Sequence, residues 1–198
     1  EFMRLGNGVY EVAFRKTNGA IAYIADKVHG GRVSEGSRHE CLWGAYQDGG
    51  SYVGGCHYSY TGTNRFSYSW SAATHTLSLL YRPDPSVSRQ VTATVTVRAS
   101  DNNYFDMRLG LQSHWGTVLD YVLFPSELVF READIQQALI PVLPGVILQR
   151  AFFEQNRSYV GKYPGEWFSD YAALSLQGGE IAIYALYADG PVLPSFLG

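Results

Sequence analysis

The clearest pattern in the chain is an alternation of apolar and polar residues between Gln90 and Pro125. In its first run, the apolar residues that share one face are Val91, Ala93, Val95 and Val97. In its second run, they are Phe105, Met107, Leu109 and Leu111. A two-residue period of this kind is typical of strands buried on one face and wet on the other. The sequence therefore predicts three consecutive strands here, the third ending at Pro125.

Turn residues between other apolar runs predict further hairpins. Residues 9–25 form two short apolar runs that are joined through Asn18-Gly19, the strongest short hairpin signal. Residues 65–82 and 171–187 follow the same plan of strand, turn and strand. Many short strands with no long helical pattern predict an all-β fold of antiparallel sheets, as in a sandwich or a barrel.

Other segments are less regular. Residues 132–139 contain Ala, Gln and Glu, which are good helix formers, and we expect one or two helical turns there. Residues 146–153 predict a strand, and Leu42-Trp43 predicts a short one. The Gly- and Tyr-rich segment 46–62 is either a long loop or a pair of irregular strands.

Composition and charge exclude several classes of partner. The net charge is −3 and the 15 Lys and Arg residues are scattered, so we expect no nucleic-acid partner. The chain has no apolar run of about 18 residues, so we expect no membrane span. Aromatic residues make up 15% of the chain. That share fits a sugar-binding protein and equally fits a large β-sandwich with nothing bound.

Short catalytic motifs give no enzymatic assignment. The chain lacks the Gly-x-Ser-x-Gly elbow, the His-Glu-x-x-His helix and a phosphate-binding loop. Paired carboxylates would indicate a glycosidase, but none of the candidates lies in a catalytic motif. These candidates are Glu127, Glu132, Asp134, Glu154, Glu166 and Asp170. We therefore assign no catalytic residue to this chain and expect no cofactor.

The two cysteines leave two alternatives open. Cys41 and Cys56 could form a disulfide in an exported protein or remain thiols in the cytosol. Together with His39 and His57 they could ligate a metal ion, but their spacing matches no zinc pattern. We therefore assign no metal site.

The segment from Tyr159 to Tyr171 is the best sequence candidate for a ligand surface. It combines aromatic residues, a turn and carboxylates within a short span, and it precedes the last predicted hairpin. We expect Tyr163 and Trp167 to stack on sugar rings and Asp170 to accept hydrogen bonds from sugar hydroxyls. The alternative is that Trp167 is buried in the core and Tyr163 packs on its neighbouring proline.

Several short motifs occur in an order that carries a resemblance to a known family. In chain order they are Asn18-Gly19, Asp26-Lys27 with Gly30, Leu42-Trp43, Phe124-Pro125 and Tyr163-Pro164-Gly165. In this order the chain resembles the N-terminal β-supersandwich domain of multidomain glycoside hydrolases, which has the galactose-mutarotase-like fold. In particular, it resembles the domain of the endo-α-N-acetylgalactosaminidase type. The resemblance implies an antiparallel β-supersandwich, with catalysis in a downstream (β/α)8 barrel.

The resemblance and the composition of the two chain ends together give the expected domain organisation. Residues 1–2 read as a cloning remnant, residues 3–188 as a single β-supersandwich domain, and residues 189–198 as a linker toward a downstream domain. With Met3 as the natural start and no secretory signal, a cytoplasmic location is favoured.

The function that follows is that of a non-catalytic domain. We expect it to pack on its own downstream catalytic barrel and to contribute to carbohydrate binding. The alternative is a free-standing carbohydrate-binding module. An aldose epimerase is the least favoured reading, because His114 does not align with the His and Glu set of the mutarotases.

Overall fold

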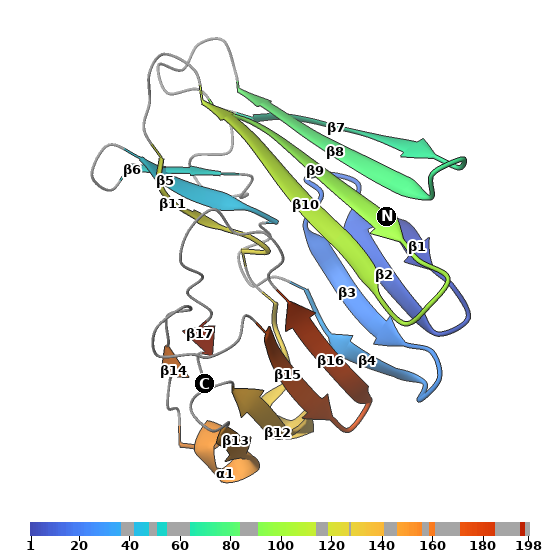
Figure 1. Ribbon diagram of the computed structural model, residues 1–198, viewed down its shortest axis with the longest axis vertical. Coiled ribbons are helices and arrows are strands. Elements are labelled where there is room, and N and C mark those ends of the chain that lie inside the picture. The colour runs from blue at the N-terminus through green and yellow to red at the C-terminus, as the bar shows by residue number, and fades with distance from the viewer. Residues whose placement is uncertain are drawn as a thin grey trace. The chain divides into compact units, whose positions relative to one another are not determined.

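Antiparallel strands account for most of the described chain, which confirms the predicted all-β class (Figure 1). The computed structural model describes residues 1–36, 42–47, 51–54, 64–83, 91–113, 119–126, 128–140, 146–155, 159–160, 171–184 and 195–196. The chain divides into two units. The first comprises Glu1–Val28 and Ser34–Val129, and the second comprises His29–Val33 and Phe130–Gly198.

Two sheets of the first unit are built from consecutive strands that pair with their neighbours in the chain. One sheet contains β1 (Phe2–Gly6), β2 (Tyr10–Arg15) and β3 (Ile21–Asp26). A second sheet has the order β10-β9-β8-β7, from β7 (Asn64–Ser71), β8 (Thr76–Pro83), β9 (Val91–Ala99) and β10 (Phe105–Ser113). A smaller sheet has the order β11-β5-β6, from β5 (Gly44–Gln47), β6 (Ser51–Gly54) and β11 (Leu119–Leu123).

The second unit contains a four-stranded sheet of order β13-β12-β15-β16. Its strands are β12 (Ile135–Ile140), β13 (Val146–Gln149), β15 (Tyr171–Leu176) and β16 (Gly179–Tyr184). Two short helical segments are η2 (Glu132–Asp134) and α1 (Arg150–Phe153), and a short pair joins β14 (Tyr159–Val160) to β17 (Ser195–Phe196). The strand β4 (Gly31–Ser34) lies where the chain passes from one unit to the other.

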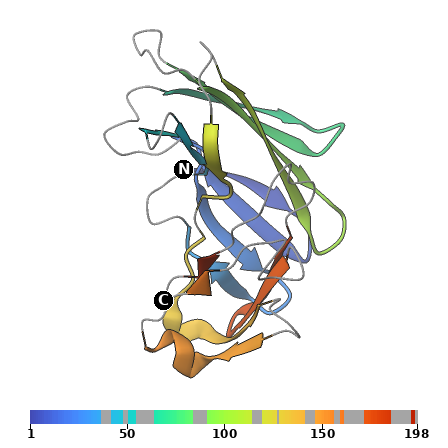
Figure 2. The same ribbon diagram turned by 60° about the vertical axis from the view of Figure 1, so that its left-hand side comes forward.

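The two larger sheets of the first unit pack face to face as a sandwich (Figure 2). The side chains that are fully buried between them include Val12 and Phe14 on β2, Leu79 on β8, and Val95 and Val97 on β9. The alternation predicted for β9 is confirmed, since its residues are buried at every second position. A core of this kind is the main source of stability in a sandwich, because it removes apolar surface from water.

The turn between β1 and β2 is hydrogen-bonded to the turn between β9 and β10. The Asn7 side-chain amide donates to the backbone carbonyls of Ser100 and Asn102, at 3.0 and 2.6 Å. Next to it, the Tyr10 hydroxyl accepts a 3.1 Å hydrogen bond from the Ser100 amide, and the Tyr10 ring stacks on Phe105 at 5.6 Å. These contacts join the two sheets at one end of the sandwich.

The helix predicted over residues 132–139 is wrong beyond its first turn. Only Glu132–Asp134 forms a helical turn, and Ile135–Ile140 is the strand β12. The Ala138 and Ile140 side chains are fully buried there, and Ala138 pairs with Leu174 of β15. Burial and cross-strand pairing therefore outweigh the intrinsic helix preference of this segment.

Two strand boundaries also differ from the expectation. The strand predicted over residues 146–153 ends at Gln149, and the following turn of α1 carries an Arg150–Glu154 ion pair of 2.7 Å. Leu42-Trp43 precedes β5 rather than forming a strand, although both side chains are fully buried. In the segment 46–62, the described residues are strand residues of β5 and β6, as one of the two alternatives predicted.

Candidate functional site

The residues predicted to contact sugar lie outside the described part of the chain. Tyr163, Trp167 and Asp170 fall in the undescribed range 161–170, so their roles stay predictions. Cys41 and Cys56 are also outside the described residues, and so are His39, His57 and His114.

The strongest candidate among the described residues is a row of aromatic side chains on β7. Phe66, Tyr68 and Trp70 occupy alternate positions of this strand, so they share one face. They lie opposite Tyr81, Leu79 and Leu77 of β8, respectively. Phe66, Tyr68 and Trp70 are referred to below as the β7 aromatic strip.

Exposure along the strip rises from one end to the other. Phe66 is half-buried, Tyr68 is 44% exposed and Trp70 is 52% exposed. Their partners on β8 are buried, so the core of the sandwich covers this face of β8 but leaves the outer part of β7 open. Large aromatic side chains in a row on an exposed strand face are uncommon, because burial would stabilise them.

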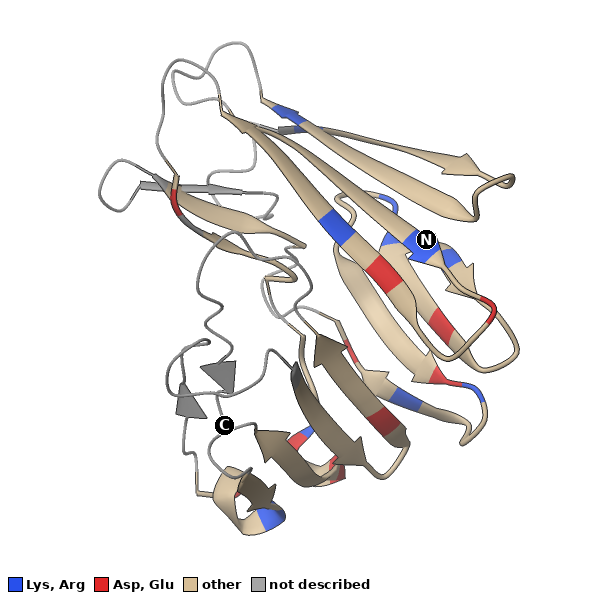
Figure 3. Ribbon diagram, in the orientation of Figure 1, with Lys and Arg blue, Asp and Glu red and all other residues tan. Residues whose placement is uncertain are grey.

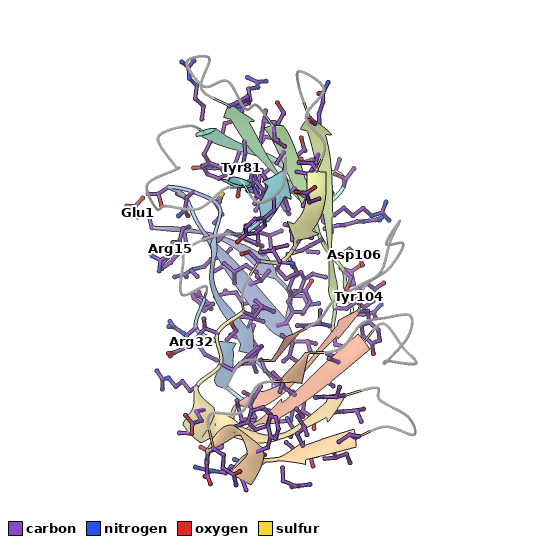
Figure 4. The ribbon with its side chains drawn as sticks, turned by 90° about the vertical axis from the view of Figure 1, so that its left-hand side faces the viewer. Glu1, Arg15, Arg32, Tyr81, Tyr104 and Asp106 are labelled. Carbon is purple, nitrogen blue, oxygen red and sulfur yellow. The ribbon has the colours of Figure 1, made fainter. Side chains whose placement is uncertain are left out.

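Contacts with the core hold the inner end of the strip in place. The Phe66 ring centroid lies 5.1 Å from that of Tyr81, and 6.1 Å from that of Tyr68. The Tyr81 ring in turn meets Trp43 edge-on at 5.7 Å. Tyr81 is drawn among the interior side chains in Figure 4, whereas Tyr104 lies at the outer edge. A rigid base of this kind fixes the orientation of the exposed rings at little cost in entropy.

The surroundings of the strip are polar but carry little charge. The opposite face of β7 presents Ser67, Ser69 and Ser71, all exposed. The sequence from Phe66 to Tyr81 contains no Lys, Arg, Asp or Glu, and Figure 3 shows the hairpin of β7 and β8 almost without charged residues. Residues two apart on a strand lie roughly 7 Å from each other. The strip therefore offers a neutral, extended, aromatic surface.

Other features of the described residues make weaker sites. A depression of about 540 Å³ is lined by Glu1, Phe2, Arg4 and Lys16. In the described ranges, no group of three or more His, Cys, Asp or Glu side chains is placed to hold a metal ion. No helix found there is long and apolar enough to cross a membrane.

The sequence predicts that β7 is a strand, but it does not predict that the aromatic face of β7 is exposed. The alternation of Phe66, Tyr68 and Trp70 with serines was the available signal, and it is equally compatible with a buried face. Three comparisons with known proteins found no relative: no family model, no curated protein and no solved structure matches the chain.

Proposed function

We propose that this chain is a non-catalytic β-sandwich domain of a glycoside hydrolase, and that it contributes carbohydrate binding through the β7 aromatic strip. The observation that carries the proposal is the exposure of Tyr68 and Trp70, at 44% and 52%, side by side on one strand face. The apolar C–H faces of sugar rings stack on aromatic rings, while the sugar hydroxyls stay in contact with water or polar groups.

The shape and charge of the strip favour one class of glycan. An open strand face covers one side of a ligand, whereas a pocket would bury most of a small ligand's surface. The spacing of the rings along β7 suits a chain of sugar residues better than a single monosaccharide. The absence of charged residues from Phe66 to Tyr81 favours a neutral glycan over a sulfated or uronic one.

The link to a glycoside hydrolase rests on the sequence motifs that resemble the galactose-mutarotase-like domain. In that arrangement the domain packs on its own downstream (β/α)8 barrel. Tyr163, Trp167 and Asp170 remain proposed as a second set of sugar contacts. A free-standing carbohydrate-binding module is the alternative, and the reading frame beyond Gly198 distinguishes the two. Alternating strands and helices over roughly 250 residues would indicate the barrel.

Titration of the purified chain with neutral oligosaccharides tests the binding function. We expect a dissociation constant of roughly millimolar or lower by calorimetry. Removal of one stacking ring, as in Trp70→Ala or Tyr68→Ala, should weaken binding by about 10-fold, which corresponds to about 1.4 kcal/mol.

Tyr104→Ala is the matched control, because Tyr104 is 53% exposed and lies outside the strip. It should leave the affinity unchanged. Binding that is equally strong in wild type, Trp70→Ala and Tyr68→Ala would move the site elsewhere, and Trp167→Ala would then test the second set of contacts. A chain that binds none of a broad glycan panel would contradict carbohydrate binding altogether.

A further inference from the structure

β7 is an edge strand of its sheet. In the order β10-β9-β8-β7 it comes last, and among the described strands it pairs only with β8. The pairing runs without a bulge from Asn64 opposite Pro83 to Ser71 opposite Thr76. The backbone groups on its other side therefore form a regular row, which is a template for one more antiparallel strand.

β7 also lacks the features that keep edge strands apart. Edge strands of soluble proteins commonly carry a charged residue, a proline or a bulge near their centre. β10, at the opposite edge of the same sheet, has Asp106 and Arg108 in its first half. In β7 the one charged residue is Arg65, near the start of the strand, and residues from Phe66 to Ser71 are neutral.

We propose that two copies of this chain associate along β7, antiparallel and centred on Tyr68, so that the two sheets become one. The sequence of β7 is nearly symmetric about this residue, with Ser-Tyr-Ser flanked by Phe66 and Trp70. In the centred register Tyr68 faces Tyr68 of the second copy, and Phe66 faces Trp70 of the second copy. Ser67 faces Ser69 of the second copy on the opposite face.

The centred register forms more aromatic pairs than the neighbouring registers do. It forms three aromatic pairs across the two strands, whereas a shift by two residues in either direction leaves only two. A shift by one residue would place serines of one copy on the aromatic face of the other, because side chains alternate along a strand. Arg65 faces Ser71 of the second copy, so no like charges meet. Aromatic cross-strand pairs are among those that stabilise antiparallel sheets.

This association goes beyond the proposed function and does not depend on it. Strand pairing uses the backbone edge of β7, while glycans would stack on the face of the rings. The dimer would place six rings on one continuous face, made of the strips of the two copies.

Charge substitution on the serine face tests the proposal. Sedimentation velocity over a concentration series should show wild type approaching twice the 22.0 kDa mass of one chain. The double variant Ser67→Lys with Ser69→Lys places Lys opposite Lys in the centred register, and it should remain monomeric. Ser67→Glu with Ser69→Glu should also be monomeric alone. A mixture of the two variants should restore dimers, since opposite charges then meet on both sides of Tyr68.

The matched control places the same charges away from the edge. Thr94→Lys with Thr96→Lys lies on β9, within the sheet, and should dimerise like wild type. Circular dichroism checks that each variant is folded. A monomeric wild type at all concentrations, a dimer that the serine-face lysines leave intact, or a mixture that fails to associate would each overturn the proposal. None of these outcomes bears on glycan binding, which is read separately by calorimetry.

Discussion

The Tyr81 hydroxyl donates a 2.9 Å hydrogen bond to the backbone carbonyl of Asn18, in the turn between β2 and β3. Tyr81 lies on β8 and is buried, and the bond, which is partly buried, links the two sheets of the sandwich. The Phe66 ring packs on the Tyr81 ring. One buried tyrosine thus joins the sheets and supports the inner end of the β7 aromatic strip.

Removing this hydroxyl should destabilise the fold. Tyr81→Phe keeps the ring but leaves the Asn18 carbonyl without its donor. We expect the free energy of unfolding to fall by about 1 kcal/mol, the usual net value of such a bond. Chemical denaturation measures the change. The exposed Tyr104→Phe serves as control and should not differ from wild type. Equal stability of Tyr81→Phe and wild type would show that the bond contributes nothing.

The same tyrosine predicts a loss of stability at high pH. Burial raises the pKa of Tyr81 above the value of about 10 that it has in the unfolded chain. The unfolded state therefore releases this proton at a lower pH than the folded state does. The stabilisation is complete below about pH 10 and is lost as the pH rises beyond that value. Denaturation midpoints above pH 10 should fall more steeply for wild type than for Tyr81→Phe.

Three glycine substitutions separate backbone strain from steric overlap. Gly19 has φ +73°, and a Cβ atom there would meet the Tyr81 hydroxyl and lie 2.8 Å from Phe66 Cε2. Gly30 has a similar φ of +76° with open space around it, and Gly8 has neither restriction. We expect Gly8→Ala to change stability by less than about 0.5 kcal/mol. Gly30→Ala should cost about 1 kcal/mol and Gly19→Ala about 2–4 kcal/mol.

Thermal or chemical unfolding of the three variants gives this order directly. Equal losses for Gly19→Ala and Gly30→Ala would mean that the contacts with Tyr81 and Phe66 relax without cost, leaving only the strain of a positive φ.

Two adjacent leucines on β8 test which face of the strand is the core. Leu79 is fully buried, whereas Leu80 is half-buried and points to the other face. Leu79→Ala should lower the free energy of unfolding by about 2–5 kcal/mol, because it leaves a cavity in a packed core. Leu80→Ala should cost less than half as much. A larger effect at Leu80 would contradict the observed register of β8.

The chemistry of the strip can be tested by keeping the rings and changing their type. Trp70→Phe and Tyr68→Phe retain a flat apolar surface, so glycan affinity should stay within about 3-fold of wild type, a change of under 1 kcal/mol. The fluorescence change on binding should be smaller in Trp70→Phe than in wild type, because Trp70 is the exposed indole of the strip. Loss of binding in Tyr68→Phe would indicate that its hydroxyl, rather than its ring, contacts the ligand.

Much of the fold follows from local sequence, and the candidate site does not. The alternation along β9 predicts its buried face, and the turn at Asn18-Gly19 needs the positive φ that Gly19 adopts. Whether the rings of Tyr68 and Trp70 are covered, however, depends on the order of strands in the sheet, and no local pattern encodes that order.

The helix predicted over residues 132–139 is wrong beyond its first turn for the same reason. Its residues favour a helix when considered alone, yet Ala138 and Ile140 are buried in a sheet whose other strands lie further along the chain. The predicted contacts of Tyr163, Trp167 and Asp170 lie outside the described residues and remain predictions.

The contacts of Asn7 have a consequence for how the first unit folds. The Asn7 side-chain amide bonds to two residues that lie 93 and 95 positions later in the chain. The strands β1 to β3, in contrast, are joined by short turns. Local hairpins close small loops and form fast, while contacts of high sequence separation are costly to form early. We expect the hairpins to form before the sheets dock. Asn7→Asp removes the donor to Ser100 and Asn102 but keeps the oxygen that accepts from the backbone of the β1–β2 turn. It should then accelerate unfolding and leave the refolding rate almost unchanged in stopped-flow experiments, whereas slower refolding would mean that docking comes first.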